Sequence, residues 1–86
     1  MEIIYTTKFA REYKKLPAQL KNLSEEREII FRENPFDSRL KTHKLKGKLK
    51  GFMAFSIDYK YRIIFEISKD EKTFYFHSVS DHDVYR

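Results

Sequence analysis

A chain of 86 residues folds as one domain, because it is too short to build a second hydrophobic core. The absence of cysteine from the sequence excludes disulfide bonds and thiolate chemistry. No apolar run approaches the ~18 residues of a membrane span and the N-terminus lacks the shape of a signal peptide, so we expect a soluble, cytoplasmic domain over residues 1–86 with no membrane partner.

The first part of the chain predicts a strand followed by a short helix. Residues 2–6 are β-branched and aromatic, which is typical of a strand. Thr7 is suited to cap the helix that follows, and apolar residues then recur at helical spacing: Phe9, Tyr13 and Leu16. Pro17 ends this helix and can serve as the first-turn residue of the next.

A second helix is predicted over residues 18–33. Its apolar residues fall along one face: Leu20, Leu23, Ile30 and Phe31. The pair Asn34-Pro35 ends it, because the residue before a proline is pushed out of the α region. The two helices are therefore expected to form a hairpin whose apolar faces contact a sheet.

Three strands are predicted in the second half of the chain, over residues 52–59, 61–68 and 73–80. In the first of these, alternation places four residues on one face: Met53, Phe55, Ile57 and Tyr59. Short connections between the strands favour an antiparallel meander. The predicted fold is α+β with the element order β-α-α-β-β-β, the helices lying on one face of the sheet.

Basic residues are concentrated in one irregular segment. The stretch from Ser38 to Ile57 has no acidic residue and holds six of the 18 basic ones: Arg39, Lys41, Lys44, Lys46, Lys48 and Lys50. Such a patch attracts polyanions, of which nucleic acid is the commonest, and Lys44, Lys46, Lys48 and Lys50 are the candidate RNA-binding residues. The alternative is a solvated loop that keeps the protein soluble.

The candidate catalytic groups are an arginine and two histidines. Arg62 is the first residue on the outward face of the strand over 61–68 and lies beside the basic segment, where its guanidinium can grip a phosphate. The alternative is a surface ion pair with Glu66 or Asp58. His43 and His82 are expected to be accessible, and an accessible imidazole is a ready general acid or base. The three histidines lack metal-site spacing, so neither a metal ion nor a cofactor is predicted.

Two further observations concern the last strand and the residues after it. His77 lies among aromatic residues and is expected to be a partly buried packing residue. The chain then runs SVSDHDVYR, with His82 between two aspartates and Tyr85 one residue from the end. This segment is either a solvated tail or the part that delivers an imidazole and a phenol to a site.

Three stretches in this order resemble the RelE/ParE superfamily of type II toxins: HKLKGKLKGF (43–52), YRIIFEI (61–67) and SVSDHDVY (78–85). The resemblance covers nearly the whole chain. It implies two helices packed on a four-stranded, mostly antiparallel sheet, and a cognate antitoxin that wraps the toxin. It also implies one of two activities, since RelE- and YafQ-like members cleave mRNA on the ribosome without a metal ion, whereas ParE-like members inhibit DNA gyrase without catalysis.

The resemblance assigns roles to four residues. Arg62 takes the place of the arginine that contacts the scissile phosphate in the RNases. His82 matches a late histidine of YafQ-like members, and Tyr85 the terminal aromatic that RelE uses near the cleavage site. His43 takes the place of a histidine that precedes the L-x-G element of YafQ-like members.

The sequence also departs from both catalytic patterns. RelE carries two lysines along its second strand and residues 52–58 have none, while Ser56 and Lys60 stand near the places of a YafQ-like His and Asp. The general base is left open among four residues: His43, His82, Lys48 and Lys50.

The expected function is that of a metal-independent, ribosome-associated mRNA endoribonuclease toxin that inhibits translation. Its expected partners are the cognate antitoxin and mRNA on the ribosome, with operator DNA reached only through the antitoxin. A ParE-like gyrase inhibitor is the alternative, and a degenerate toxin kept as a DNA-binding repressor partner is a third possibility.

Overall fold

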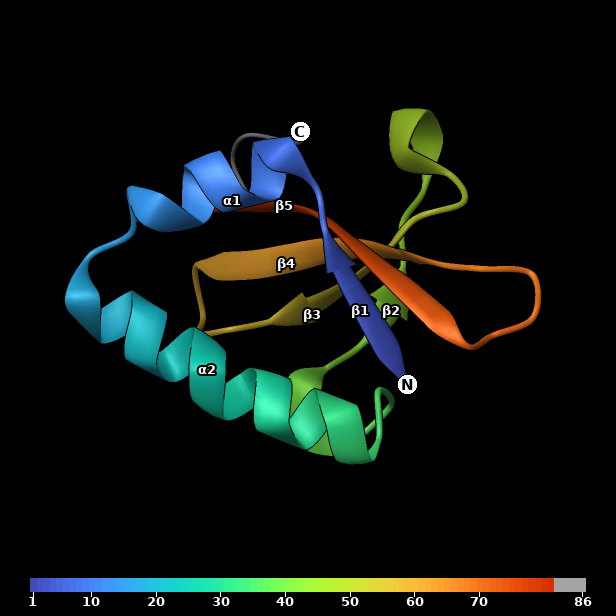
Figure 1. The fold of residues 1–86 in the computed structure, drawn as a ribbon, viewed down its shortest axis with the longest axis horizontal. Coiled ribbons are helices and arrows are strands. Elements are labelled where there is room, and N and C mark those ends of the chain that lie inside the picture. Colours follow the sequence, from blue (N-terminus) through green and yellow to red (C-terminus); the bar gives the residue numbers. More distant parts are fainter. Residues whose placement is uncertain (82–86) are drawn as a thin grey trace.

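A computed structural model describes residues 1–81, which form two helices packed on a five-stranded mixed sheet (Figure 1). The elements in chain order are β1 (Glu2–Tyr5), α1 (Thr7–Lys14), α2 (Ala18–Glu33), β2 (His43–Lys44), β3 (Met53–Ser56), β4 (Tyr61–Ile67) and β5 (Thr73–Asp81). Two short 3-10 turns lie between α2 and β3: η1 (Ser38–Leu40) and η2 (Gly47–Leu49). No helix in this part of the chain has the length and apolar character needed to cross a membrane.

The strands lie in the order β1-β5-β4-β3-β2. β1 pairs in parallel with β5, and the other three pairings are antiparallel. The α+β fold, the helical hairpin and the meander of β3, β4 and β5 are therefore confirmed. The sheet has one strand more than the expected four, because two residues of the basic segment pair with β3 to form β2.

The helix boundaries follow local capping chemistry. Thr6, and not the expected Thr7, caps α1, since its Oγ1 accepts a hydrogen bond from the amide of Phe9 at 3.1 Å. α2 begins at Ala18, directly after Pro17, and ends at Glu33, as predicted. The apolar residues expected on both helices all pack into or against the core.

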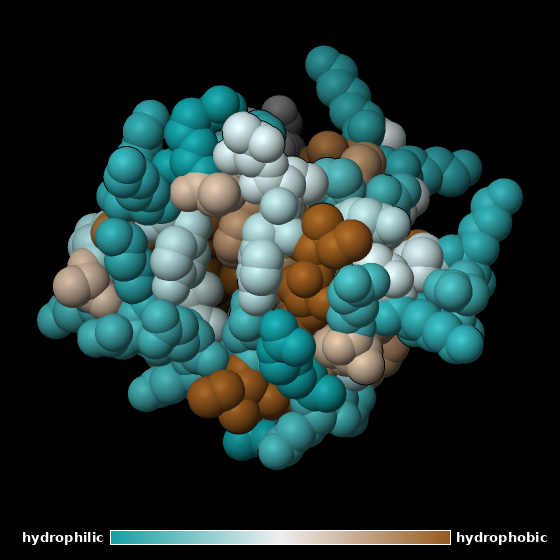
Figure 2. Space-filling model, in the orientation of Figure 1, coloured by the Kyte–Doolittle hydropathy of each residue, from teal (hydrophilic) through white to brown (hydrophobic). Residues whose placement is uncertain are grey.

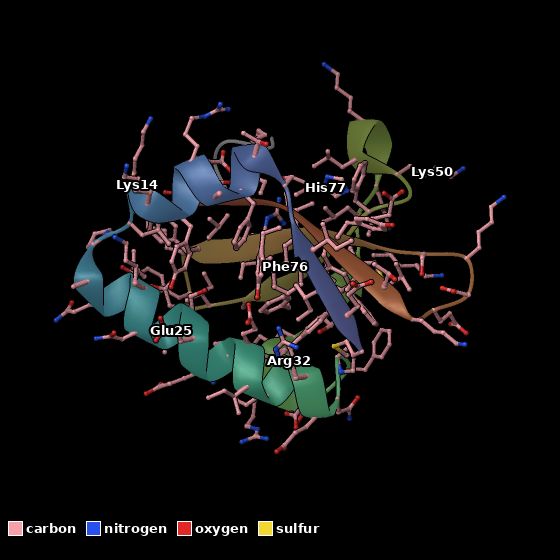
Figure 3. All side chains as sticks on the ribbon, viewed as in Figure 1. Lys14, Glu25, Arg32, Lys50, Phe76 and His77 are labelled. Atoms are coloured by element: carbon pink, nitrogen blue, oxygen red, sulfur yellow. The ribbon has the colours of Figure 1, made fainter. Side chains whose placement is uncertain are left out.

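Aromatic rings form the centre of the core. Phe31 of α2 is fully buried, stacks on Phe55 at 4.8 Å and meets Phe65, Phe74 and Phe76 edge-on at 5.1–5.3 Å. Offset and edge-to-face geometries are the ones that aromatic quadrupoles favour. Figure 3 shows Phe76 between the sheet and the helices. One residue of α2 thus contacts three strands of the sheet.

A β-bulge interrupts the pairing of β4 with β5. Phe65 lies opposite Phe76 and Ile64 opposite Ser78, so His77 is the extra residue on β5. The core consequently takes Phe76 and Val79, three positions apart, in place of a strict alternation. The bulge turns two consecutive residues, His77 and Ser78, away from the core.

The face assigned to Tyr59 is a correction. Alternation along residues 52–59 placed it with the core, but its side chain is 93% exposed. β3 ends at Ser56, and the turn that follows is held by Asp58, whose Oδ1 accepts from the amides of Lys60 at 2.8 Å and Tyr61 at 2.6 Å. The strand pattern therefore stops before Tyr59, although Ile57 is still buried.

Candidate nucleic-acid interface

The face of the sheet opposite the helices, here called the outer face, carries the candidate side chains in two rows. Residues directly opposite each other on neighbouring antiparallel strands point to the same face. The first row runs across β3, β4 and β5: Ser56, Arg62 and Ser80. The second row begins on β2: His43, Ala54, Ile64 and Ser78. The register thus places Arg62 and His43 on the same face, in adjacent rows.

Arg62 is half-buried on β4, with a serine opposite it on each neighbouring strand. The two carboxylates considered as surface partners contact other groups. Asp58 accepts from two backbone amides, and Glu66 Oε1 lies 3.3 Å from His77 Nε2. A guanidinium based in the middle of a sheet is held more firmly than one on a loop, which suits bidentate contact with a phosphate.

His43 lies exposed on the edge strand β2. Its Nδ1 is 2.9 Å from the carbonyl oxygen of Lys41. Because a carbonyl only accepts hydrogen bonds, Nδ1 is the donor, and the lone pair of a neutral ring is then on Nε2. Two strand spacings and a two-residue offset along the strand separate the backbone of His43 from that of Arg62, about 12 Å at ordinary sheet dimensions. His43 therefore has a basic nitrogen on the same face as Arg62 but beyond direct contact with it.

The predicted lysine set divides into two groups. Lys46, Lys48 and Lys50 are exposed around η2, and Figure 3 shows Lys50 directed away from the body of the molecule. Hydrophilic side chains project from this end of the molecule in the space-filling view (Figure 2). Lys44 lies opposite Met53, which packs against the core, so Lys44 belongs to the other face of the sheet from His43. The pairing of β2 separates Lys44 from the other three.

Solved structures provide the comparison for this arrangement. A YoeB/ParE toxin from Agrobacterium tumefaciens superposes with a TM-score of 0.79 over 95% of this chain and 99% of its own, at 18% identity. YafQ from E. coli strain BL21(DE3) gives 0.76 over 96% and 94%, at 19% identity. YafQ in the E. coli DinJ-YafQ toxin-antitoxin complex gives 0.73 over 98% and 94%, at 20% identity. No protein-family model matches the sequence, and no curated protein sequence matches it.

The chain has the RelE/ParE toxin fold. The superpositions cover 95–96% of this chain, so most of the sheet that carries Arg62 and His43 belongs to the shared backbone architecture. The identities of 18–20% describe a common backbone and leave the side chains of each site to be argued from this chain itself.

Within this RelE/ParE fold, Lys60 is not a free base. Its Nζ lies 3.4 Å from Oδ2 of Asp81, at the end of β5. The hydrogen bond with Asp81 and the charge of its carboxylate raise the pKa of Lys60. A lysine that is held protonated can neutralise a phosphate but cannot accept a proton, so Lys60 does not join His43, Lys48 and Lys50 as a described candidate for the general base.

His82 and Tyr85 lie outside the described residues, so their assigned roles stay predictions. β5 continues to Asp81, which is opposite Tyr61, one position before Arg62 in the sequence. In the sequence, His82 comes directly after Asp81, the last residue of β5.

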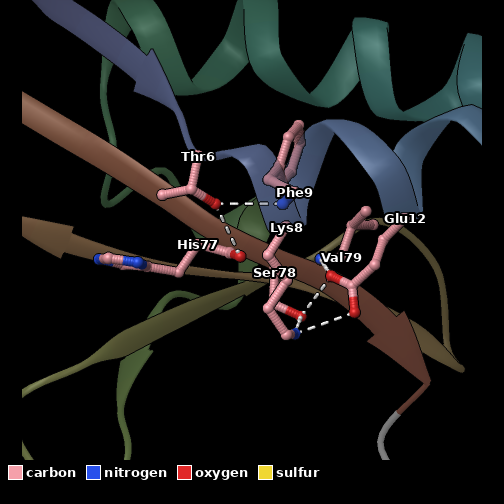
Figure 4. Close-up of polar contacts among 7 residues, drawn as sticks. All are labelled: Thr6, Lys8, Phe9, Glu12, His77, Ser78 and Val79. Atoms are coloured by element: carbon pink, nitrogen blue, oxygen red, sulfur yellow. Dashed lines mark hydrogen bonds and ion pairs between the residues drawn. The ribbon is translucent and has the colours of Figure 1, made fainter.

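Sequence analysis missed a polar network behind the bulge (Figure 4). Glu12 Oε1 accepts from Ser78 Oγ at 2.7 Å and from the amide of Val79 at 3.1 Å, and its Oε2 lies 2.9 Å from Lys8 Nζ. Lys8 Nζ also donates to Ser78 Oγ at 3.0 Å. Burial acts to raise the pKa of Glu12, but these hydrogen bonds outweigh it and lower the pKa. The i,i+4 spacing of Lys8 and Glu12 was the visible signal, and nothing in the sequence linked them to Ser78.

Residues 1–81 contain no group of three or more His, Asp or Glu side chains arranged to hold a metal ion.

Proposed function

We propose that the chain is the toxin of a type II toxin–antitoxin pair and cleaves mRNA on the ribosome without a metal ion. The observation that carries the proposal is the register of the sheet, which puts Arg62 and His43 on one face beside the cations of η2. The RelE/ParE fold and the likeness to two YafQ structures support it. Within the superfamily resemblance, the RelE- and YafQ-like members are the ones that cut mRNA.

Each group has a chemical task in this proposal. Nε2 of His43 removes the proton of the ribose 2′-hydroxyl, whose oxygen then attacks the adjacent phosphorus. The guanidinium of Arg62 donates to the phosphate oxygens as negative charge develops on them. His82 protonates the departing 5′ oxygen, and Tyr85 stacks on a base near the cleaved bond. The gap of about 12 Å between the backbones of His43 and Arg62 requires that the sugar and its phosphate lie between the two side chains.

The proposed partners are a cognate antitoxin and mRNA on the ribosome. One of the similar structures is a toxin–antitoxin complex, which supports the first. The cations of η2 support the second, since polyanion binding draws on exposed lysines. Operator DNA would be reached only through the antitoxin, and the cytoplasm would be the site of action.

Inhibition of DNA gyrase without catalysis is the second candidate. The composition of β3 favours this candidate. The outer-face residues of β3 are Ala54 and Ser56, and neither supplies an ionisable group for catalysis beside Arg62. One of the similar structures is a YoeB/ParE toxin. On this alternative, Arg62 and His43 would be contact residues of a protein-binding surface.

Expression of the chain without an antitoxin separates the two candidates. Purified programmed ribosomes are incubated with the full chain, and primer extension on the mRNA maps any new 5′ ends; supercoiling by purified gyrase is measured in parallel. New ends that persist in EDTA support the RNase proposal. Intact mRNA together with inhibited supercoiling would replace it with the gyrase alternative.

A further inference from the structure

A second feature of the outer face is a cavity of ≈ 290 Å³ beside the bulge. Apolar side chains line much of it: Leu49, Phe52 and Ile64. Four polar residues complete the wall: Thr6, Lys8, His77 and Ser78. Ile64 and Ser78 belong to the row next to that of Arg62, so the cavity adjoins the proposed site without being part of it.

The bulge builds this cavity and fixes its shape. In a regular strand His77 and Ser78 would point to opposite faces, but the extra residue lets both line the same space. Thr6 Oγ1 donates to the carbonyl oxygen of His77 at 3.1 Å, and Glu12 accepts from Ser78 and Val79 (Figure 4). Helix α1 therefore clamps both sides of the bulge, and the cavity is formed before any ligand arrives.

The walls of the cavity suit a flat ring with a polar edge. Phe52 and His77 meet edge-on at 5.0 Å, and Glu66 lies 3.3 Å from the His77 Nε2 atom, which orients the imidazole. The ammonium of Lys8 is held by Glu12 and Ser78 as a fixed donor. The volume lies just below the usual range of about 300–1,000 Å³ for small-molecule sites, which suits a single planar group. Nucleobases combine these properties, and proteins hold unpaired bases by stacking them on aromatic rings.

The charge around the cavity favours RNA over an apolar side chain of a protein. Leu49 lines the cavity from η2, and its two neighbours in the sequence, Lys48 and Lys50, are exposed. A base inserted here would bring its own phosphates to these cations. We propose that the cavity binds one unpaired base of a single-stranded RNA and so contributes to sequence preference. This inference rests on the proposed function, because it assumes that RNA crosses the outer face.

The test uses the full chain, labelled with ¹⁵N, and 2′-O-methyl tetranucleotides, which cannot be cleaved through the 2′ oxygen. One tetranucleotide carries four adenines, and a second has abasic residues in their place with the same number of phosphates. The adenine form is expected to shift the amide signals of Phe52, Ile64 and His77, and the abasic form is expected to leave them in place. Equal shifts with both forms would show that phosphates alone are recognised and would overturn the inference.

Variants measure the contribution of stacking. Phe52→Ala is expected to weaken binding of the adenine tetranucleotide by about 5- to 150-fold, the range for loss of one base–aromatic stack. Phe36→Ala is the matched control, since Phe36 is an exposed phenylalanine that does not line the cavity. Phe52→Leu keeps apolar packing should the alanine variant unfold, and it is expected to bind at least about fivefold more weakly. Unchanged affinity in a folded Phe52 variant would refute the proposal.

The same proteins are assayed on programmed ribosomes, so that the two proposals can fail separately. Cleavage by the wild type with an unresponsive cavity would retain the RNase proposal and remove the base pocket. Base-dependent shifts without cleavage would retain the pocket and remove the RNase proposal. If a bound antitoxin, and not the oligonucleotides, shifts the cavity signals, the occupant is a protein side chain and the inference is wrong.

Discussion

Arg62 is the residue on which the proposed chemistry depends most. Its planar fork can hold two phosphate oxygens, whereas a lysine at the same position offers a point charge. Arg62→Lys is therefore expected to lower the single-turnover cleavage rate on programmed ribosomes by about 10²–10³-fold, the typical cost of removing one transition-state donor.

The matched control is Arg11→Lys, the same exchange at an exposed arginine of α1. It is expected to cleave at the rate of the wild type. A rate within a few-fold of the wild type for Arg62→Lys as well would make Arg62 a surface residue and move the proposed active site elsewhere.

Glu12 illustrates a residue whose importance is structural. Glu12→Ala removes the acceptor of the Ser78 hydroxyl and of the Val79 amide, and an unsatisfied buried group costs about 1–3 kcal/mol. We expect that loss in the free energy of unfolding, measured by urea denaturation at pH 7. Glu12→Gln keeps an oxygen acceptor and is expected to lose less. Glu26→Ala, at an exposed position of α2, should stay within about 0.5 kcal/mol of the wild type.

The lowered pKa of Glu12 also predicts a pH dependence. A carboxyl whose pKa falls below its usual 4.5 on folding stabilises the folded chain above that pH. This contribution is lost as the pH falls through the lowered value. Asp37 and Asp70 also have lowered pKa values, and that of Asp37 is about 2 because of its hydrogen bonds with Arg39. The stabilisation that these two carboxylates contribute is likewise lost as the pH falls. The difference in unfolding free energy between wild type and Glu12→Gln should therefore shrink between pH 6 and pH 3; a constant difference would contradict the network.

At the scale of elements, η2 is expected to supply affinity for RNA. Replacing Lys46, Lys48 and Lys50 with glutamine removes up to three cations that neutralise phosphates. The dependence of log K on log salt concentration should flatten by roughly one unit for each phosphate that is no longer neutralised. Fluorescence anisotropy with a single-stranded RNA between 50 and 300 mM salt measures this slope. The affinities of the variants are compared with that of the wild type at about 100 mM salt.

The control removes the same charge from the other end of the molecule. Lys14, Lys15 and Lys21 lie where α1 meets α2, and Figure 3 shows Lys14 far from Lys50. Their replacement by glutamine should leave the slope close to that of the wild type. An equal effect of both triple variants would mean that net charge alone attracts the RNA and would restore the interpretation of η2 as a solubility device.

The elements that sequence could predict are those with a local pattern. Both helices and the strands β3, β4 and β5 had an apolar period, and β1 had a short β-branched and aromatic run. Pro17 and Pro35 marked the limits of α2. β2 has two residues, a histidine and a lysine, so no pattern announces it. It forms because the chain returns beside β3, and this pairing alone decides that His43 and Lys44 face opposite sides.

The sequence predicted which types of residue the candidate site contains, but it did not predict how these residues are arranged in space. Arg62 and the cations of η2 were visible in the sequence, since charge and strand position are local properties. The bulge was not, because the run of apolar and small residues from Phe74 to Ser80 fits a strand with or without an extra residue. The cavity beside His77 and the clamp by Glu12 both depend on that bulge, so neither could be foreseen.

At the scale of the whole molecule, stability depends on one aromatic cluster. Phe31→Ala would empty the space in which α2 contacts the rings of β3, β4 and β5. Such truncations cost about 3–5 kcal/mol, a large part of the roughly 5–15 kcal/mol that stabilises a domain. We expect a variant that is largely unfolded at 37 °C, as measured by circular dichroism during thermal denaturation.

A second substitution on the same helix controls for changes in helix propensity. Ile29 is 63% exposed, and Ile29→Ala should leave the free energy of unfolding within about 0.5 kcal/mol of the wild type. If Phe31→Ala were equally mild, the core would be able to collapse around the missing ring, and its stability would be distributed more widely than the ring contacts indicate.

The order of the strands has a consequence for the time at which the protein becomes active. β5 lies between β1 and β4, yet it is synthesised after every other described element. β1 has no neighbour until Thr73, which is 71 positions after Glu2, has been made. Non-local pairings of this kind form late and slowly. A nascent chain that has not yet released residues 73–81 has no continuous sheet, no bulge and no row containing Ser80 beside Arg62. Under the proposed function, interrupted synthesis should therefore yield inert fragments, and only a completed chain should act on a ribosome.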